Sequence, residues 1–455
     1  MRGSAVVGDV IESRPFTGFQ WRTAILCAAV IFMEGYDAQA VGYVAPSMSA
    51  ALHVGRGALG PVLAAAIVGL MLGGFLIAPL ADRIGRRKVI IGSTLAFGLL
   101  SLATPLVDSI AGLAFLRLLT GLGLGGAMPN VISLTSEYSP RRINGRVVMV
   151  MFCGFSLGSA GGGFAAAALI ADFGWRSIFI VGGILPLLLL PLLVWALPES
   201  IRYLALRPNG QLKALQLLAR IDPAVASAER VGVSTEEKHI AAMSVRQLFA
   251  EGRTGGTLML WIIFAMSLLD IAMVASWLPT VLNAGGATLK VAALTGSLFQ
   301  IGGIAGTLLM GAIIDRVRAE WMLLLAYLLG ALCLGLVGQV DPQGAEMFVV
   351  VAFAGFGIVG GQIAANAVAA RFYPTPIRST GIGWAFGVGR IGSIAAPMVG
   401  GMLLGLQIPP AQVFVFSVVP TLLAAAASLG LAFTRRLRDP EVAGAPFSPQ
   451  QPARG

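Results

Sequence analysis

The chain has 455 residues, of which 57% are hydrophobic and 11% are charged, and its mean hydropathy is +0.85. Soluble domains carry roughly 25% charged residues, so this composition excludes a soluble globular protein. The formal net charge of +10 does not indicate a nucleic-acid partner, because the basic residues fall in the gaps between apolar stretches, where they act as topology signals.

Apolar stretches of about 20 residues recur along the chain, each long enough to cross a bilayer as a helix. We predict an all-α polytopic membrane protein with twelve transmembrane helices in two pseudo-symmetric six-helix halves. In chain order we expect a cytoplasmic N-terminal segment at 1–21, an N-terminal half at 22–197, a cytoplasmic linker at 198–255 with an amphipathic helix near 211–220, a C-terminal half at 256–434 and a disordered cytoplasmic tail at 435–455. The predicted membrane helices are 22–46, 58–80, 88–106, 110–134, 147–170, 176–197, 256–282, 291–314, 321–340, 345–370, 380–405 and 411–434.

The distribution of basic residues predicts the orientation. The residues before Trp21 hold no apolar run, so we expect no cleavable signal peptide. With the N-terminus inside, 26 of the 31 Lys and Arg lie on the inner side, three lie outside and two lie within helices. The positive-inside rule therefore places both termini in the cytoplasm.

The two halves show an internal repeat. Parallel repeats about an axis along the membrane normal imply a central cavity between the halves, opened alternately to each side. A displacement of 233 residues matches Gly69 with Gly302, Gly73 with Gly306, Asp82 with Asp315 and Arg83 with Arg316.

A charged loop at 78–88 follows the second predicted helix, and it is similar to the G-x-L-A-D-R-x-G-R-R/K loop of the major facilitator superfamily, with Ala78 in place of the first glycine. A carboxylate close to a helix N-terminus and to several arginines can form an ion-pair latch that holds one face closed. The alternative is a loop that only sets topology. The predicted latch residues are Asp82, Arg83, Gly85, Arg86 and Arg87, with Asp315 and Arg316 in the second copy.

Two further segments resemble the same superfamily. Residues 117–126 resemble its R-x-x-x-G-x-G-x-G segment, and residues 198–204 resemble the P-E-S-x-R-W/Y-L segment of sugar and organic-ion porters. The drug-efflux antiporters carry a Gly-Pro pair in the fifth helix, and the matching stretch at 154–161 has no proline. The resemblance therefore argues against export.

The first predicted helix carries Glu34-Gly-Tyr-Asp37, which resembles the D-G-F/Y-D signature of the aromatic acid:proton symporters, with Glu in place of the first Asp. Four more segments match that family, namely Met-Pro-Asn at 128–130, Ser-Glu-Tyr-Ser-Pro at 136–140, Ser-Trp-Leu-Pro-Thr at 276–280 and Gly-Val-Gly-Arg-Ile-Gly at 387–392.

Five ionisable residues fall deep inside the predicted helices and are candidates for proton coupling and substrate binding: Glu34, Asp37, Arg117, Asp270 and Arg390. Ionisable groups at membrane depth cost several kcal/mol unless they line a cavity or find a partner. Glu34 and Asp37 share one helical face, so their repulsion allows one of them to carry a proton. The alternatives are a structural ion pair with Arg117 and a packing role for Arg390, and the resemblance supplies no role for Asp270.

Aromatic and amide side chains in the same helices could line a substrate site. Aromatic rings could stack on a substrate ring, and amides could bond a ring hydroxyl, although packing and interhelical hydrogen bonds are the alternatives. These residues are Tyr36, Tyr43, Trp277, Phe299, Gln362, Asn366 and Trp384.

The resemblance implies a proton-coupled transporter that imports an aromatic carboxylate of the benzoate, hydroxybenzoate or phenylpropanoate type by alternating access. The alternatives are another organic-anion or sugar porter of the same fold and, less favoured, an efflux antiporter or a sensor that does not transport. The sequence holds no cluster of nucleophile, base or metal ligands, so we expect no enzyme activity, cofactor or metal. We expect a monomer in the bacterial inner membrane.

Overall fold

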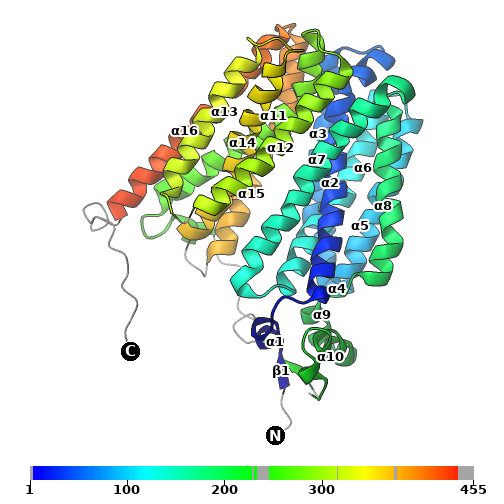
Figure 1. The fold of residues 1–455 in the computed structure, drawn as a ribbon, viewed down its shortest axis with the longest axis vertical. Helices are drawn as coiled ribbons and strands as arrows, with labels where there is room; N and C mark the ends of the chain where they lie inside the picture. Colours follow the sequence, from blue (N-terminus) through cyan, green and yellow to red (C-terminus); the bar gives the residue numbers. More distant parts are fainter. Residues whose placement is uncertain (1–3, 228–229, 233–244, 315, 374–376, 439–455) are drawn as a thin grey trace.

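The computed structural model describes residues 4–227, 230–232, 245–314, 316–373 and 377–438. Within these ranges, twelve helices are long and apolar enough to cross a membrane, which confirms the predicted fold class. The helices stand side by side in one bundle, and α1, α9 and α10 lie beyond one of its ends (Figure 1). We call this end of the bundle the terminal end, and the opposite one the far end.

The spanning helices fall into two sets of six, one in each half of the chain. The set in the first half is α2 (Gly18–Ala51), α3 (Gly60–Leu76), α5 (Arg86–Ala103), α6 (Ile110–Glu137), α7 (Arg141–Phe173) and α8 (Arg176–Ala196). The set in the second half is α11 (Thr254–Ala284), α12 (Leu289–Ile313), α13 (Ala319–Val337), α14 (Ala345–Phe372), α15 (Arg378–Gly405) and α16 (Pro410–Arg438).

Short elements occupy the loops, the N-terminal segment and the linker. They are β1 (Ser4–Val6), α1 (Val7–Ser13), η1 (Arg56–Leu59), η2 (Ala78–Leu80), α4 (Ala81–Ile84), η3 (Thr104–Leu106), α9 (Ile201–Ala205), η4 (Pro208–Gly210), α10 (Gln211–Ala219), η5 (Pro223–Ser227), β2 (Arg230–Gly232) and η7 (Val245–Phe249).

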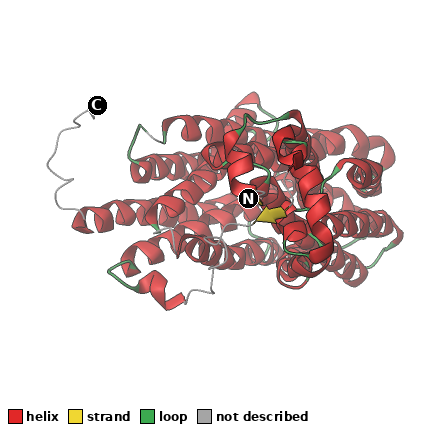
Figure 2. Cartoon of the chain, turned by 90° about the horizontal axis from the view of Figure 1, so that it is seen from below, coloured by secondary structure: helices red, strands yellow, loops and turns green. Residues whose placement is uncertain are grey.

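The N-terminal segment and the linker pack together at the terminal end, where a strand lies beside the N-terminus (Figure 2). Strand β1 pairs in parallel with β2, and Val7, Val10 and Ile11 are buried in the same cluster as the linker helices. Arg14 donates a hydrogen bond to Asp222 over 3.0 Å, and this guanidinium holds the pKa of Asp222 below its usual value. The segments that the sequence places before and between the halves therefore form one small cap.

Glycines bring the helices of each half into backbone contact at matching positions. In the N-terminal half α3 packs on α6, where a Cβ at Gly69 would lie 2.1 Å from the carbonyl oxygen of Leu118. In the C-terminal half α12 packs on α14, where a Cβ at Gly302 would lie 1.9 Å from the carbonyl oxygen of Ala352. Small residues allow this close approach in membranes, so the repeated glycines mark equivalent helix pairs.

The two halves meet mainly through the far-end portions of their helices. A Cβ at Gly42 of α2 would lie 2.1 Å from the carbonyl oxygen of Ala275 on α11. The hydroxyl of Ser297 on α12 donates to the carbonyl of Ala160 on α7 over 2.9 Å. Toward the terminal end the ribbons of the two halves diverge (Figure 1). The bundle is thus held together at its far end.

The glycine contacts predict a local stability effect. Gly302→Ala should lower the unfolding temperature of the detergent-solubilised protein, because the new Cβ would overlap the Ala352 carbonyl, and overpacking costs about 1–3 kcal/mol. Gly92→Ala is the matched control, since nothing lies within 4 Å of a Cβ there. Alanine should raise the stability of the helix at that position by about 0.5–1 kcal/mol. An equal or higher unfolding temperature for Gly302→Ala would contradict this account of the packing.

Candidate functional site

A buried ion pair joins α2 to α6, the first and fourth spanning helices. Arg117 on α6 donates from Nη1 to Oδ1 of Asp37 on α2 over 3.0 Å and from Nη2 to Oδ2 over 2.7 Å. Both side chains are 1% exposed. Nη2 also donates to the Asp37 carbonyl over 3.3 Å, and the guanidinium lies 5.6 Å from the Phe179 ring centroid. This bidentate geometry leaves the pair neutral, and the Nε of Arg117 is buried without a partner among the described residues.

Glu34 lies one helical turn before Asp37 and has a different environment. Its side chain is 1% exposed, and neither carboxylate oxygen has a hydrogen-bond partner among the described residues. Its electrostatic partners are Arg390, on α15 of the other half, and Asp37. A buried carboxylate without a partner is costly. Glu34 is therefore the acid in this group that most needs a proton or a cation.

Arg390 is the cation that faces Glu34 across the two halves. It is partly exposed and forms no ion pair within the described parts of the chain. Two glycines next to it hold α15 against α11, since a Cβ at Gly392 would lie 2.2 Å from the Ala265 carbonyl oxygen and one at Gly389 would lie 3.1 Å from that of Phe264. The helix packing therefore presents a guanidinium that retains its capacity to bind an anion.

Asp270 lies apart from this group, although sequence depth placed it at the same level. It is fully buried on α11, where Oδ2 accepts a hydrogen bond from the Thr421 hydroxyl on α16 over 2.8 Å. Oδ1 has no partner among the described residues, and Tyr327 of α13 lies close enough to interact with the carboxyl electrostatically. These neighbours all belong to the C-terminal half, so the structure does not join Asp270 to Glu34.

The predicted lining aromatics are mostly packed in this conformation. Tyr36, Tyr43, Trp277 and Phe299 are buried, and the two tyrosine hydroxyls donate to backbone carbonyls, Tyr36 to Ile178 over 3.1 Å and Tyr43 to Ser159 over 3.0 Å. Trp384 in contrast is 44% exposed. It stacks on Trp261 with 6.0 Å between ring centroids.

The predicted amides form a small polar chain on α14. Gln362 accepts a hydrogen bond from Ser267 on α11, and its Nε2 lies 3.5 Å from Oδ1 of Asn366. Gln362 is buried and Asn366 is partly exposed. Among the predicted substrate residues, Arg390, Trp384 and Asn366 thus have surface available to a ligand.

In the 78–88 loop, the described ion pair uses a carboxylate other than that of Asp82. Asp82 and Arg83 are exposed, and Asp82 forms no ion pair with any residue that the structure describes. Arg86 pairs with Glu137, which also accepts a hydrogen bond from Ser200 over 2.6 Å. The latch role of Asp82 remains a prediction. In the second copy, Arg316 is exposed and Asp315 lies outside the described residues.

Glu199 occupies the N-terminus of α5. Its Oε1 accepts the backbone N–H of Arg87 over 3.1 Å and that of Ser200 over 2.9 Å. Gly85 is required here, because its φ is +100° and a Cβ would lie 2.3 Å from Oε2 of Glu199. Glu137 and Glu199 were not predicted as site residues. The available signal was that the motifs at 136–140 and 198–204 each contain an acid.

Three comparisons place the chain among known proteins. The Major Facilitator Superfamily model matches residues 27–250 and 260–453. The 4-hydroxybenzoate transporter PcaK of Pseudomonas aeruginosa is 41% identical over 420 residues, covering 92% of this chain and 94% of the relative. The gallate transporter of Pseudomonas putida is 41% identical over 436 residues, covering 96% and 97%. The 3-(3-hydroxy-phenyl)propionate transporter of Escherichia coli is 36% identical over 419 residues, covering 91% and 94%.

Solved structures show the same fold. A bacterial homolog of the human lysosomal transporter Spinster, in an inward-facing and unoccupied conformation, aligns with a TM-score of 0.70 at 15% identity, covering 95% of this chain and all of that one. The xylose transporter XylE from E. coli, in a partially occluded inward-open conformation, aligns with a TM-score of 0.69 at 17% identity, covering 90% and 97%. The family match and the fold agree, and the chain belongs to the major facilitator superfamily.

Proposed function

We propose that this protein imports an aromatic carboxylate together with one or more protons by alternating access, and that it is a transporter without enzyme activity. Relatives that match over more than nine tenths of their length are transporters of 4-hydroxybenzoate, gallate and 3-(3-hydroxy-phenyl)propionate. These substrates share an aromatic ring and a carboxylate, which is the chemistry that the site must recognise.

The observation that carries this proposal is that Glu34 and Arg390 interact electrostatically across the two halves, while the Glu34 oxygens have no hydrogen-bond partner among the described residues. Without substrate, an ionised Glu34 balances the charge of Arg390. With substrate, the carboxylate of the ligand balances Arg390 and Glu34 carries a proton. Both states are neutral at this pair, whereas substrate without the proton, or the proton without substrate, leaves a net charge in a low-dielectric site. Competition between Glu34 and the substrate carboxylate for the Arg390 guanidinium thus couples substrate transport to proton transport.

The Asp37–Arg117 pair contributes to this scheme as a fixed neutral neighbour. Its hydrogen bonds hold α2 against α6, so Glu34 is presented toward the opposite half from a rigid position. Substrate ring contacts would come from Trp384, and a ring hydroxyl would bond Asn366, because both have exposed surface. A sugar carries no carboxylate to balance Arg390, which makes a sugar porter the weaker alternative.

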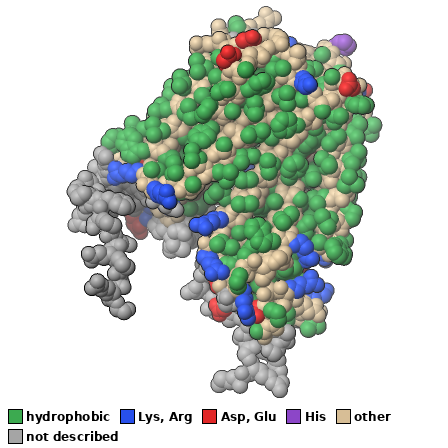
Figure 3. Space-filling view, in the orientation of Figure 1, with side chains coloured by type: hydrophobic (Ala, Val, Ile, Leu, Met, Phe, Trp, Pro, Cys, Tyr) green, Lys and Arg blue, Asp and Glu red, His purple; other side chains and the backbone are tan. Residues whose placement is uncertain are grey.

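Orientation follows from the charges at the terminal end. Lysine and arginine side chains gather near this end of the bundle, and apolar side chains cover its flank (Figure 3). By the positive-inside rule we place the terminal end, with both termini, in the cytoplasm of a bacterium, and the spanning helices in its inner membrane. The described conformation is then closed to the outside, because the halves are joined at the far end.

The coupling scheme predicts a separation of two activities in Glu34→Gln. Proton-driven accumulation of 4-hydroxybenzoate into proteoliposomes should be lost, because the amide keeps the shape but exchanges no proton. Substrate counterflow, which needs no net proton movement, should persist. Glu346→Gln is the matched control, since Glu346 is an exposed acid at the far end. Accumulation at the level of the unmodified protein in Glu34→Gln would refute the role of Glu34.

A second prediction concerns recognition of the anion. Arg390→Lys should weaken equilibrium binding of 4-hydroxybenzoate by about 1–3 kcal/mol, because the lysine keeps the charge but loses the planar fork. Arg318→Lys, at an exposed arginine, should bind like the unmodified protein. If Arg390→Lys and Arg390→Ala both bind normally while Arg117→Lys does not, the anion contact belongs to Arg117.

The latch hypothesis predicts an effect of Asp82→Asn on conformation. Asp82 makes no ion pair among the described residues while the halves are apart at the terminal end, so its partner should engage only when that end closes. Asp82→Asn should therefore increase maleimide labelling, from the terminal side, of a cysteine placed at Asn366 in an otherwise cysteine-free chain. Asp172→Asn, an exposed acid at the far end, is the control. Identical labelling of the parent protein, Asp82→Asn and Asp172→Asn would contradict the latch hypothesis and leave the loop with a role in topology alone.

A further inference from the structure

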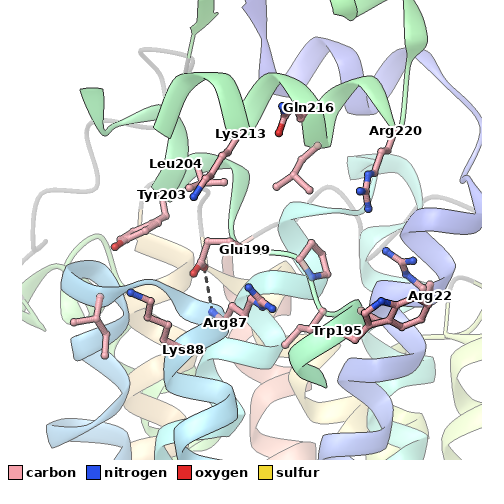
Figure 4. A pocket seen from close by; sticks show the side chains of 15 residues that line it. Arg22, Arg87, Lys88, Trp195, Glu199, Tyr203, Leu204, Lys213, Gln216 and Arg220 are labelled. Atoms are coloured by element: carbon pink, nitrogen blue, oxygen red, sulfur yellow. Dashed lines mark hydrogen bonds between the residues drawn. The ribbon is translucent and has the colours of Figure 1, made fainter. Parts of the chain in front are cut away.

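A cavity of about 490 Å³ lies at the terminal end of the N-terminal half, apart from Glu34 and Arg390. It opens between the ends of α2, α5 and α8 and the linker helices α9 and α10 (Figure 4). Its charged lining consists of five basic side chains and one acidic one, namely Arg22, Arg87, Lys88, Lys213, Arg220 and Glu199.

The positive charge of this cavity is not compensated by the protein. None of its five basic side chains forms an ion pair with an acid in the part of the chain that the structure describes. The Glu199 carboxylate accepts backbone N–H groups of Arg87 and Ser200 instead. The Nε atoms of Arg22 and Arg87 are buried without a partner. A concave site whose charged lining is mainly basic attracts an anion.

The cavity lies where the hydrocarbon layer would end. Trp195, which lines it, is the penultimate residue of α8 and is 82% exposed. Leu188 and Leu192 on the same helix are also exposed, as expected of a surface that faces lipid. Tryptophan is enriched at the level of lipid head groups. The cavity is therefore accessible from the bilayer as well as from water.

The linker side of the cavity is amphipathic. Lys213 of α10 and Arg220, which directly follows this helix, contribute to the lining, and Leu212 of α10 is exposed. Arg220 and Arg22 both lie near the ring of Phe19, with guanidinium carbons 5.6 Å and 5.2 Å from its centroid. The Phe19 ring thus brings two cations to the same side of the cavity, where an anion would reduce their repulsion.

We propose that this cavity binds the head group of an anionic phospholipid, with the phosphate among the arginines and lysines and the acyl chains along the exposed face of α8. A soluble phosphate ester would satisfy the same basic groups, but it would leave Trp195 and the leucines of α8 without a ligand. The bound lipid would tie the linker to the N-terminal half. Basic pockets at the cytoplasmic ends of membrane helices bind anionic head groups in this way.

The test measures equilibrium binding to the full-length protein in detergent. The probes are dioctanoyl phosphatidylglycerol, dioctanoyl phosphatidylcholine and glycerol 3-phosphate, which separate the anionic lipid from a neutral lipid and from a free head group. Phosphatidylglycerol should bind at least about tenfold more tightly than either of the other two. Lys213→Gln combined with Arg220→Gln should weaken it by about tenfold, whereas Lys213→Arg combined with Arg220→Lys should retain binding.

The matched control is Arg146→Gln combined with Arg318→Gln, which removes two exposed charges from the terminal side of other helices and should leave binding unchanged. Equal binding of phosphatidylcholine would overturn the proposal, and glycerol 3-phosphate binding as tightly as the lipid would assign the cavity to a soluble anion. Normal binding by the Lys213 and Arg220 glutamine variant would also overturn it. The comparison of probes on the unmodified chain decides the question even if that variant fails to fold.

Discussion

A charged side chain at the middle of a bilayer must be paired, protonated or placed against a water-filled space, and the two acids of α2 meet this requirement differently. Asp37 is paired with Arg117 through two direct hydrogen bonds. Glu34, one turn away, has no hydrogen-bond partner within the described chain. One acid is thus fixed and the other is free to change its protonation state. In the proposed cycle Asp37 therefore has a structural role, and Glu34 carries the coupled proton.

Helix packing determines which groups can move relative to one another. Within each half, glycines place backbones in contact, as at Gly35, where a Cβ would lie 2.0 Å from the Phe155 carbonyl oxygen. Such contacts leave little room for sliding, so each half should move as a unit. Glu34 and Arg390 belong to different halves, and in the proposed rocking cycle their separation would change. Asp37 and Arg117 belong to the same half, so the distance between them would stay the same.

The sequence predicted the fold well because the signals for it are local. Apolar length gives the spans, and the glycine repeat identifies the matching helix pairs. Depth in the membrane could also be estimated from residue spacing. The direction in which a side chain points could not be predicted from residue spacing, because it depends on how each helix is rotated against its neighbours. Asp270 illustrates this, since it has the expected burial but faces Thr421 inside its own half.

The site residues were predictable only in part for the same reason. Depth within the predicted helices identified Glu34, Asp37 and Arg117 as candidates, but the choice of Asp37 as the partner of Arg117 required the geometry of two helices. Trp277 and Phe299 have the residue type for ring stacking, yet both are buried in the helix packing. Burial of an aromatic depends on distant contacts, which a pattern along one helix does not record.

The polar network at the terminal end adds a constraint on how the protein can switch. Glu137, Glu199 and Tyr138 connect α6, α5 and the linker, with the Tyr138 hydroxyl donating to the Glu199 carbonyl over 2.7 Å. Gln20 of α2 joins the same network by donating to the Tyr138 carbonyl over 2.7 Å. These four residues belong to the N-terminal half or its linker, so the proposed rocking of the halves would not need to break these bonds. Groups that face the other half can contribute to the energetic difference between conformations, and Glu34 is one whose charge a single proton can change.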